Sequence, residues 1–160
     1  MERFFKYSLT VLISTVAAME FYQVVMRYIL EIPVMGLEEL LVYPTLWLYF
    51  LGSVNASRED TQIKANVLDV FLKTERSKLT VRVIADALGV VVSFWLTYWA
   101  WDYFRYAWRV WKESPTLYVP TFYAECSLFI GLVLMTMYAS FYLVKNFRKR
   151  FTSPATEQGA

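Results

Sequence analysis

The sequence contains no histidine, and this absence excludes several common kinds of functional site. Haem ligation by histidine, histidine-based zinc sites and histidine general bases are all removed. The single cysteine, Cys126, has no partner for an internal disulfide and reads as a small apolar helix residue. Neither a GxxxxGK(S/T) nor a GxGxxG motif occurs, so we expect no ATP hydrolysis and no dinucleotide binding.

Charge is also scarce, whereas apolar residues are abundant. The net charge is only +2, and the basic residues form no stripe suited to a nucleic acid. Of the 160 residues, 58% are hydrophobic and 19% are aromatic. A soluble domain averages roughly 45–50% apolar residues by a similar count. The composition therefore indicates a membrane protein.

Four windows are long and apolar enough to approach the ~20 residues that a spanning helix needs. We predict an all-α integral membrane protein with four transmembrane helices, forming one domain over residues 1–150. A short amphipathic helix at the cytoplasmic membrane surface is predicted over 60–76, and packing of this helix on its own bundle is the alternative. Residues 151–160 form a polar tail that we expect to be disordered. The predicted spans are about 7–30, 40–57, 83–104 and 122–144.

The basic residues predict the orientation of these spans, because Lys and Arg concentrate in cytoplasmic loops. With four spans, most of the 16 Lys and Arg residues fall on one side, in the N-terminus, the 58–82 link and the tail. Both termini should therefore be cytoplasmic, and the 31–39 and 113–121 links should face outward. An odd number of spans would divide these basic clusters between the two sides.

The first span carries three polar residues on one helix face, namely Glu20, Gln23 and Arg27. Intramembrane charges are rare and normally face protein or water. Arg27 lies near the outer boundary, whereas Glu20 lies closer to mid-span and requires a partner. Gln23 could supply part of it, and we expect a neighbouring helix to contribute as well.

The outer end of the third span combines aromatic and charged residues. Nearly all the tryptophans lie between Trp95 and Trp111, as expected for an aromatic belt at the membrane interface. Asp102, Arg105 and Arg109 share one helix face there. We interpret them as neutralised or snorkelling charges at headgroup level rather than as an ion pathway.

The second span begins with two adjacent glutamates, Glu38 and Glu39, at the positive end of its helix dipole. A clamp between these carboxylates and the Arg27 guanidinium is geometrically reasonable, because only a ten-residue link separates them. Further along, Gly52 and Ala56 form a small-xxx-small pair that would allow close helix contact. Contact with a partner protein is an alternative role for these residues.

An ordered series of residues resembles the DctQ family, the small membrane subunits of tripartite ATP-independent periplasmic (TRAP) transporters. The resemblance covers roughly residues 5–145. In the first half it is carried by "RYILEIPVMGLEELLVYPTLWLYFLGSVNASREDTQIKANVLDVF", with matches at Arg27, Glu38, Glu39, Leu51, Gly52, Ala56, Arg58 and Ile63. In the second half it is carried by "SPTLYVPTFYAECSLFIGLVLM", with matches at Ser114, Leu117, Pro120, Gly131 and Met135.

The sequence departs from the family pattern at three places. The tryptophan that precedes the glutamate pair is missing, Gln62 replaces the usual histidine, and Asn66 replaces the usual aspartate. Gln62 and Asn66 carry no charge and do not titrate, and their amides act only through hydrogen bonds.

The resemblance implies a supporting role in sodium-coupled uptake of an organic acid or similar solute in the bacterial inner membrane. The implied partners are a large DctM-type permease subunit, a periplasmic solute-binding protein of the DctP type and membrane lipid, with no nucleic acid and no cofactor. The resemblance implies no enzymatic activity. The main alternative is a small four-helix proton-coupled exporter that acts as a homodimer through Glu20.

Overall fold

The computed structural model describes residues 2–32, 34–59 and 75–152, and this part of the chain is almost entirely helical. Helix α1 (Glu2–Val24) continues into a π-helical turn, η1 (Val25–Ile29). Helix α2 (Leu37–Glu59), helix α4 (Glu75–Val110) and helix α5 (Phe122–Thr152) follow. These elements coincide with the four predicted windows and are mostly longer than them; the windows are 7–30, 40–57, 83–104 and 122–144.

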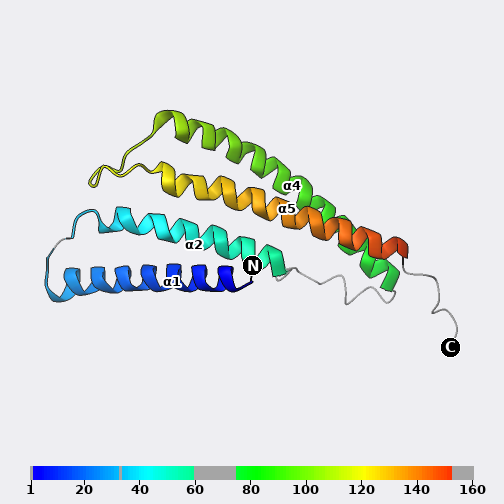
Figure 1. Ribbon diagram of the computed structural model, residues 1–160, viewed down its shortest axis with the longest axis horizontal. Coiled ribbons are helices and arrows are strands. Elements are labelled where there is room, and N and C mark those ends of the chain that lie inside the picture. The colour runs from blue at the N-terminus through cyan, green and yellow to red at the C-terminus, as the bar shows by residue number, and fades with distance from the viewer. Residues whose placement is uncertain (1, 33, 60–74, 153–160) are drawn as a thin grey trace.

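The helices form two antiparallel hairpins, α1–α2 and α4–α5, that pack side by side (Figure 1). Helix α2 packs against α1 and α5, and α5 also packs against α4, so the spatial order is α1, α2, α5, α4. The edges of this row are therefore α1 and α4. We call one end of the row the loop end, where the link before α2 and the 111–121 link lie; the opposite end is the terminal end.

Small and hydroxylated side chains fill the seams between the helices, while large apolar side chains point outward. The buried residues include Ala100, Ala107, Ala124, Ser127 and Thr136. Between α4 and α5, the Thr97 and Thr136 hydroxyl oxygens lie 2.9 Å apart, and Asn146 donates a 2.7 Å hydrogen bond to Asp86. Seams of small and polar residues are characteristic of helices that associate in lipid.

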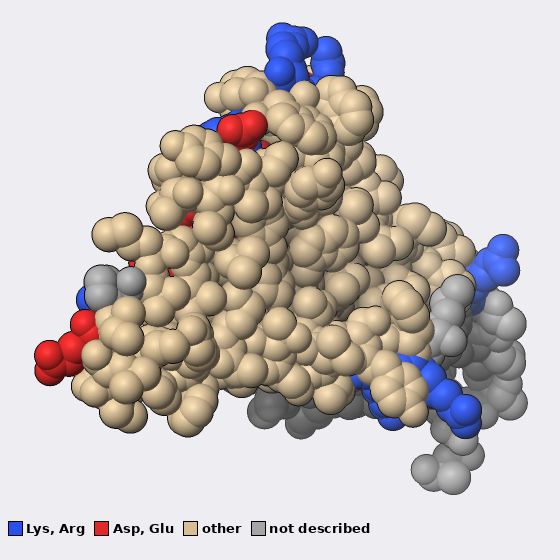
Figure 2. Space-filling model, turned by 60° about the vertical axis from the view of Figure 1, so that its left-hand side comes forward, with Lys and Arg blue, Asp and Glu red and all other residues tan. Residues whose placement is uncertain are grey.

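The outer surface also indicates that the helices lie in lipid, because aromatic and aliphatic side chains cover it. Phe21 is 71% exposed, Trp95 62% and Phe141 62%. Figure 2 shows a broad uncharged face, with the visible Lys, Arg, Asp and Glu residues gathered toward its margins. A water-soluble monomer would not present so extensive an apolar surface. The chain is a membrane protein.

Among the described residues, three helices are long and apolar enough to cross a membrane, over Arg3–Ile29, Thr80–Val110 and Phe122–Arg148. Helix α2 is not among them; its sequence includes Pro44, Thr45, Ser53 and Asn55 between the apolar residues. The prediction of four spans is therefore supported for three helices and is not established for α2. Of the predicted amphipathic segment 60–76, residues 60–74 lie outside the described residues, and Glu75 and Arg76 begin α4.

The end of the chain likewise differs from its predicted boundary. Residues 151 and 152 belong to the predicted polar tail, whereas in the structure they are the last residues of α5. The remainder of the predicted tail, residues 153–160, lies outside the described part of the chain.

Candidate functional site

Polar contacts concentrate at the loop end, where the first glutamate of the pair connects α1 to α2. The Gln23 amide donates a 2.8 Å hydrogen bond to Oε1 of Glu38, and Nη1 of Arg27 lies 3.7 Å from the same oxygen. The π-helical turn that carries Arg27 places it here, with Leu30 N–H donating to Val25 O. The Arg27 and Glu38 side chains are 64% and 71% exposed, so this ion pair alone contributes little to stability.

The second glutamate reaches the other hairpin. The Glu39 carboxylate accepts hydrogen bonds from the Ser114 hydroxyl, from Thr116 N–H at 3.1 Å and from Leu117 N–H at 3.2 Å. Partial burial opposes ionisation, but the hydrogen bonds from Thr116 and Leu117 outweigh it and hold the Glu39 pKa below its ordinary value. Adjacent helical residues point about 100° apart, so Glu38 can contact α1 while Glu39 contacts the 111–121 link.

Two aromatic residues of α2 strengthen its attachment to the second hairpin, Tyr43 at the 111–121 link and Trp47 at the start of α5. The Tyr43 hydroxyl lies 3.1 Å from Val119 O and 3.2 Å from Pro120 O, and Trp47 Nε1–H donates to Tyr123 O at 3.0 Å. Sequence reasoning missed both residues. Amphipathic rings on a helix near a membrane boundary often form hydrogen bonds, and this could have pointed to both residues. The sequence does not show which carbonyl groups accept these bonds.

Gly36 permits the close approach of the two links. It adopts a φ of +87°, and a Cβ atom built on it would lie 2.8 Å from Leu117 Cγ. A side chain at position 36 would therefore be strained and would also collide with the opposite link. Together, Gln23, Arg27, Glu38, Glu39, Tyr43 and Ser114 form what we call the loop-end network.

Arg58 lies at the terminal end of α2, away from the loop-end network. Its guanidinium lies over the Phe5 ring at 5.3 Å and forms a 2.7 Å ion pair with Glu59, while its carbonyl accepts a 2.6 Å bond from Tyr142. The contacts place Arg58 between α1 and α5. Gln62 and Asn66 lie outside the described residues.

The predicted helix contact through Gly52 requires a correction. A Cβ atom built on Gly52 would meet nothing within 4 Å, so Gly52 itself makes no close helix contact within the described chain, and its contact with a partner protein stays a prediction. Ala56 is half-buried. The close approach of α2 to α5 occurs instead at Gly131, where an added Cβ would lie 2.8 Å from Phe50 Cβ.

Glu20 also differs from expectation. The sequence predicts a hydrogen bond from the Gln23 amide to Glu20, but this amide donates to Glu38 instead. Glu20 is exposed on α1, and within the described residues no hydrogen bond or ion pair reaches its carboxylate.

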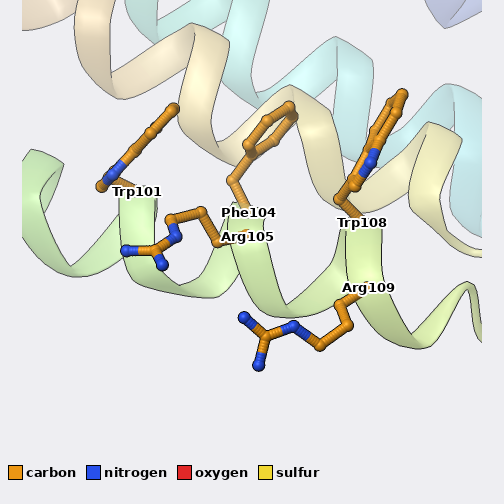
Figure 3. Close-up of a pocket in the computed structure, with 5 residues that line it drawn as sticks. All are labelled: Trp101, Phe104, Arg105, Trp108 and Arg109. Atoms are coloured by element: carbon orange, nitrogen blue, oxygen red, sulfur yellow. The ribbon is translucent and has the colours of Figure 1, made fainter.

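The surface of the described structure is hollowed along α4 and along α1. The first, of about 690 Å³, lies along α4 and is lined by Trp101, Phe104, Arg105, Trp108 and Arg109 (Figure 3). The second, of about 550 Å³, is lined mainly by α1, including Thr10, Ser14, Thr15 and Ala18. Among the described residues, no group of three His, Cys, Asp or Glu side chains is placed to hold a metal ion.

The fold and the loop-end network define a helical membrane protein whose polar contacts join its own elements. The sequence matches the family described as tripartite ATP-independent periplasmic transporters, DctQ component, over residues 16–149. This match covers most of the chain, and the chain belongs to the DctQ family. A search of curated proteins found no significant match.

Proposed function

We propose that this chain supports the large DctM-type permease in sodium-coupled, binding-protein-dependent uptake of an organic acid or similar solute. Family membership indicates a small TRAP transporter subunit. The observation in the structure that best supports a supporting role is the loop-end network, whose polar groups bind one another: Gln23 donates to Glu38 within the first hairpin, and Ser114 and Leu117 of the second hairpin donate to Glu39. A solute pathway would instead require several polar groups converging near mid-membrane.

The proposed arrangement has α2 crossing the inner membrane together with the other three helices. Helix α2 has 23 residues, or about 34 Å at 1.5 Å per residue, which exceeds the ~30 Å hydrocarbon core. It packs between α1 and α5, both apolar enough to span the membrane. Four crossings would place both termini in the cytoplasm and the loop end in the periplasm, in agreement with the positive-inside rule.

Within this arrangement, Arg27, Glu38 and Glu39 act as a structural clamp that sets the geometry of the periplasmic end. The contacts of Glu38 with α1 and of Glu39 with the 111–121 link support this role. The exposed part of the clamp is also available to the DctP-type binding protein when it delivers solute. Neither role requires catalysis, and we propose no enzymatic activity.

The test is affinity purification of the tagged full-length chain from its native membrane in mild detergent, followed by mass spectrometry. We expect a large polytopic permease in stoichiometric amount. Uptake measurements with and without each recovered partner would then identify the solute and the coupling ion. Recovery of this chain alone as a homodimer would overturn the proposal and favour the proton-coupled exporter, in which Glu20→Gln should abolish transport.

A further inference from the structure

Glu20 lies on the free flank of an edge helix, within an apolar stripe. Ile13, Ala17, Glu20 and Val24 recur at helical spacing along this flank, and we call them the Glu20 stripe. Ile13 is 56% exposed and Val24 is 49% exposed. Helix α1 packs only against α2 and η1 in any substantial way among the described elements, so this flank is uncovered in the isolated chain.

The position of Glu20 along the span makes exposure to lipid unfavourable. The apolar span runs over Arg3–Ile29, and Glu20 lies about 13 Å along the helix axis from its loop end. A glutamate side chain is too short to cover that distance to the headgroups. A carboxylate at such depth normally faces protein and pairs with a donor.

We propose that the Glu20 stripe is the surface on which the large permease subunit packs, with a permease helix donating a hydrogen bond to the Glu20 carboxylate. The donor would be a Lys, Arg, hydroxyl or amide side chain at the same depth. Ala17, one turn before Glu20, leaves room for the close approach of that helix. The inference rests on the proposed function and adds the contact surface to it.

A second copy of this chain fits the surface less well. Copies related by a two-fold axis along the membrane normal would meet at the same depth, with Glu20 facing Glu20. Two ionised carboxylates in that setting repel each other, and they can form a hydrogen bond only if one of them first binds a proton. A partner of different sequence removes this conflict.

The experiment compares the recovery of the complex for tagged wild type, Glu20→Leu, Glu20→Gln and the control Thr15→Leu. Thr15 lies on the same helix about 140° from Glu20, and its hydroxyl is satisfied by Val11 O. We expect Glu20→Leu to weaken association with the permease by about 3- to 20-fold, the range for interhelical hydrogen bonds in membranes. Glu20→Gln should fall between the wild type and Glu20→Leu, and Thr15→Leu should match the wild type.

A thermal melt of each purified chain separates association from folding. Because leucine suits lipid better than a carboxylate does, Glu20→Leu should not lower the melting temperature of the isolated chain. Equal complex recovery for Glu20→Leu and wild type, or an equal loss with Thr15→Leu, would overturn this inference and leave the proposed function intact. If wild type recovered no permease, the proposed function itself would fail.

A second, independent observation concerns the hollow of about 690 Å³ on α4. Figure 3 shows the Trp101, Phe104 and Trp108 rings projecting toward α5, with the Arg105 and Arg109 side chains directed away from them. The Trp108 ring packs on Phe122 with centroids 5.2 Å apart, which fixes the aromatic side of the hollow. The hollow thus combines an apolar wall with two cationic groups.

The two arginines are incompletely neutralised. Arg105 Nη1 lies 4.0 Å from Asp102 Oδ1, and both of these side chains are more than half exposed. Among the described residues, no hydrogen bond or ion pair reaches the Arg109 guanidinium. Both arginines occupy the last two turns of the span Thr80–Val110, at the depth of lipid headgroups.

We infer that this hollow binds an anionic phospholipid, with its phosphate between Arg105 and Arg109 and part of an acyl chain along the rings. Guanidinium groups bind phosphate through paired charge-assisted hydrogen bonds. The aromatic wall supplies the apolar contact that a free phosphate would not use. This combination favours a lipid over a soluble anion.

Native mass spectrometry of the full chain with equal amounts of dioleoyl phosphatidylglycerol and dioleoyl phosphatidylethanolamine tests the site. We expect wild type to retain phosphatidylglycerol preferentially, and Arg105→Gln/Arg109→Gln to reduce this preference by about 5-fold for each arginine removed. The control Arg3→Gln/Arg148→Gln removes the same charge at the terminal end. Three results would each overturn the inference: an unchanged preference in the first variant, an equal loss in the control, or displacement of the lipid by inorganic phosphate.

Discussion

At the residue scale, two neighbouring carboxylates at the start of α2 have different partners and different exposure. Glu38 is largely exposed and accepts from Gln23 on its own hairpin. Glu39 is half-buried and accepts from a hydroxyl and two backbone N–H groups of the 111–121 link. Because backbone donors on a link have few alternative acceptors, Glu39 is the more consequential of the two.

We predict that Glu39→Gln lowers the melting temperature of the purified chain, while Glu38→Gln changes it little. The neutral amide weakens the charge-assisted bonds from Thr116 and Leu117 and presents an NH₂ group where an acceptor is needed. Circular dichroism melts in detergent measure the difference. Equal melting temperatures for the two variants would contradict the assigned importance of Glu39.

The same contact predicts a pH dependence in wild type. The folded-state pKa of Glu39 lies below its ordinary value of 4.5. The stability that ionised Glu39 gives to the folded chain is therefore fully present above pH 4.5. This stability should be lost as the pH falls through the lower pKa that Glu39 has in the folded chain. The melts of Glu39→Gln should lack this component, and an identical acid dependence in both proteins would contradict it.

At the scale of the elements, one glycine governs the contact between α2 and α5. A Cβ atom on Gly131 would lie 2.8 Å from Phe50 Cβ, an atom next to the backbone that moves only with its helix. The equivalent test at Gly52 meets nothing within 4 Å, although Gly52 belongs to the recognisable small-xxx-small pair. Close packing therefore depends on which residue stands opposite, as well as on the small residue itself.

We predict that Gly131→Ala destabilises the chain and that Gly52→Ala does not. Overpacking costs about 1–3 kcal/mol, whereas alanine gains about 1 kcal/mol over glycine in a helix interior. Only the gain applies at Gly52. Thermal melts of both variants, each measured as the isolated chain in detergent, provide the comparison. A higher melting temperature for Gly131→Ala would show that α2 and α5 separate easily.

At the scale of the whole molecule, the row of four helices makes the crossing of α2 the decisive topological question. If α2 crosses, the link before α2 and the 111–121 link lie on the same side of the membrane. If α2 does not cross, the two links lie on opposite sides. The side-by-side arrangement of the links in Figure 1 and the contacts of Glu39 with Thr116 and Leu117 favour the first arrangement.

We predict that Met35→Cys and Glu113→Cys both react with a membrane-impermeant thiol reagent applied to intact spheroplasts. Arg3→Cys should react only after the membrane is opened. Each cysteine is introduced after Cys126→Ser, because Cys126 is the natural thiol. Labelling of position 35 but not position 113 would exclude four crossings with the proposed orientation.

By itself, the sequence determined the membrane class, the approximate helix windows and the family resemblance, because these follow from composition, local hydropathy and motif order. The approach of Arg27 to Glu38 was also accessible from the sequence, since a short link holds the two residues together. Local patterns carry this information because they do not depend on which distant segments meet.

Only the tertiary structure decided which helices are neighbours. It placed Glu39 on Ser114, 75 residues away, assigned the close contact to Gly131 instead of Gly52, and left Glu20 on an uncovered flank. The physical reason is that each helix satisfies its own backbone hydrogen bonds. Its choice of neighbours therefore depends on the shape and polarity of side chains that lie far apart in the sequence.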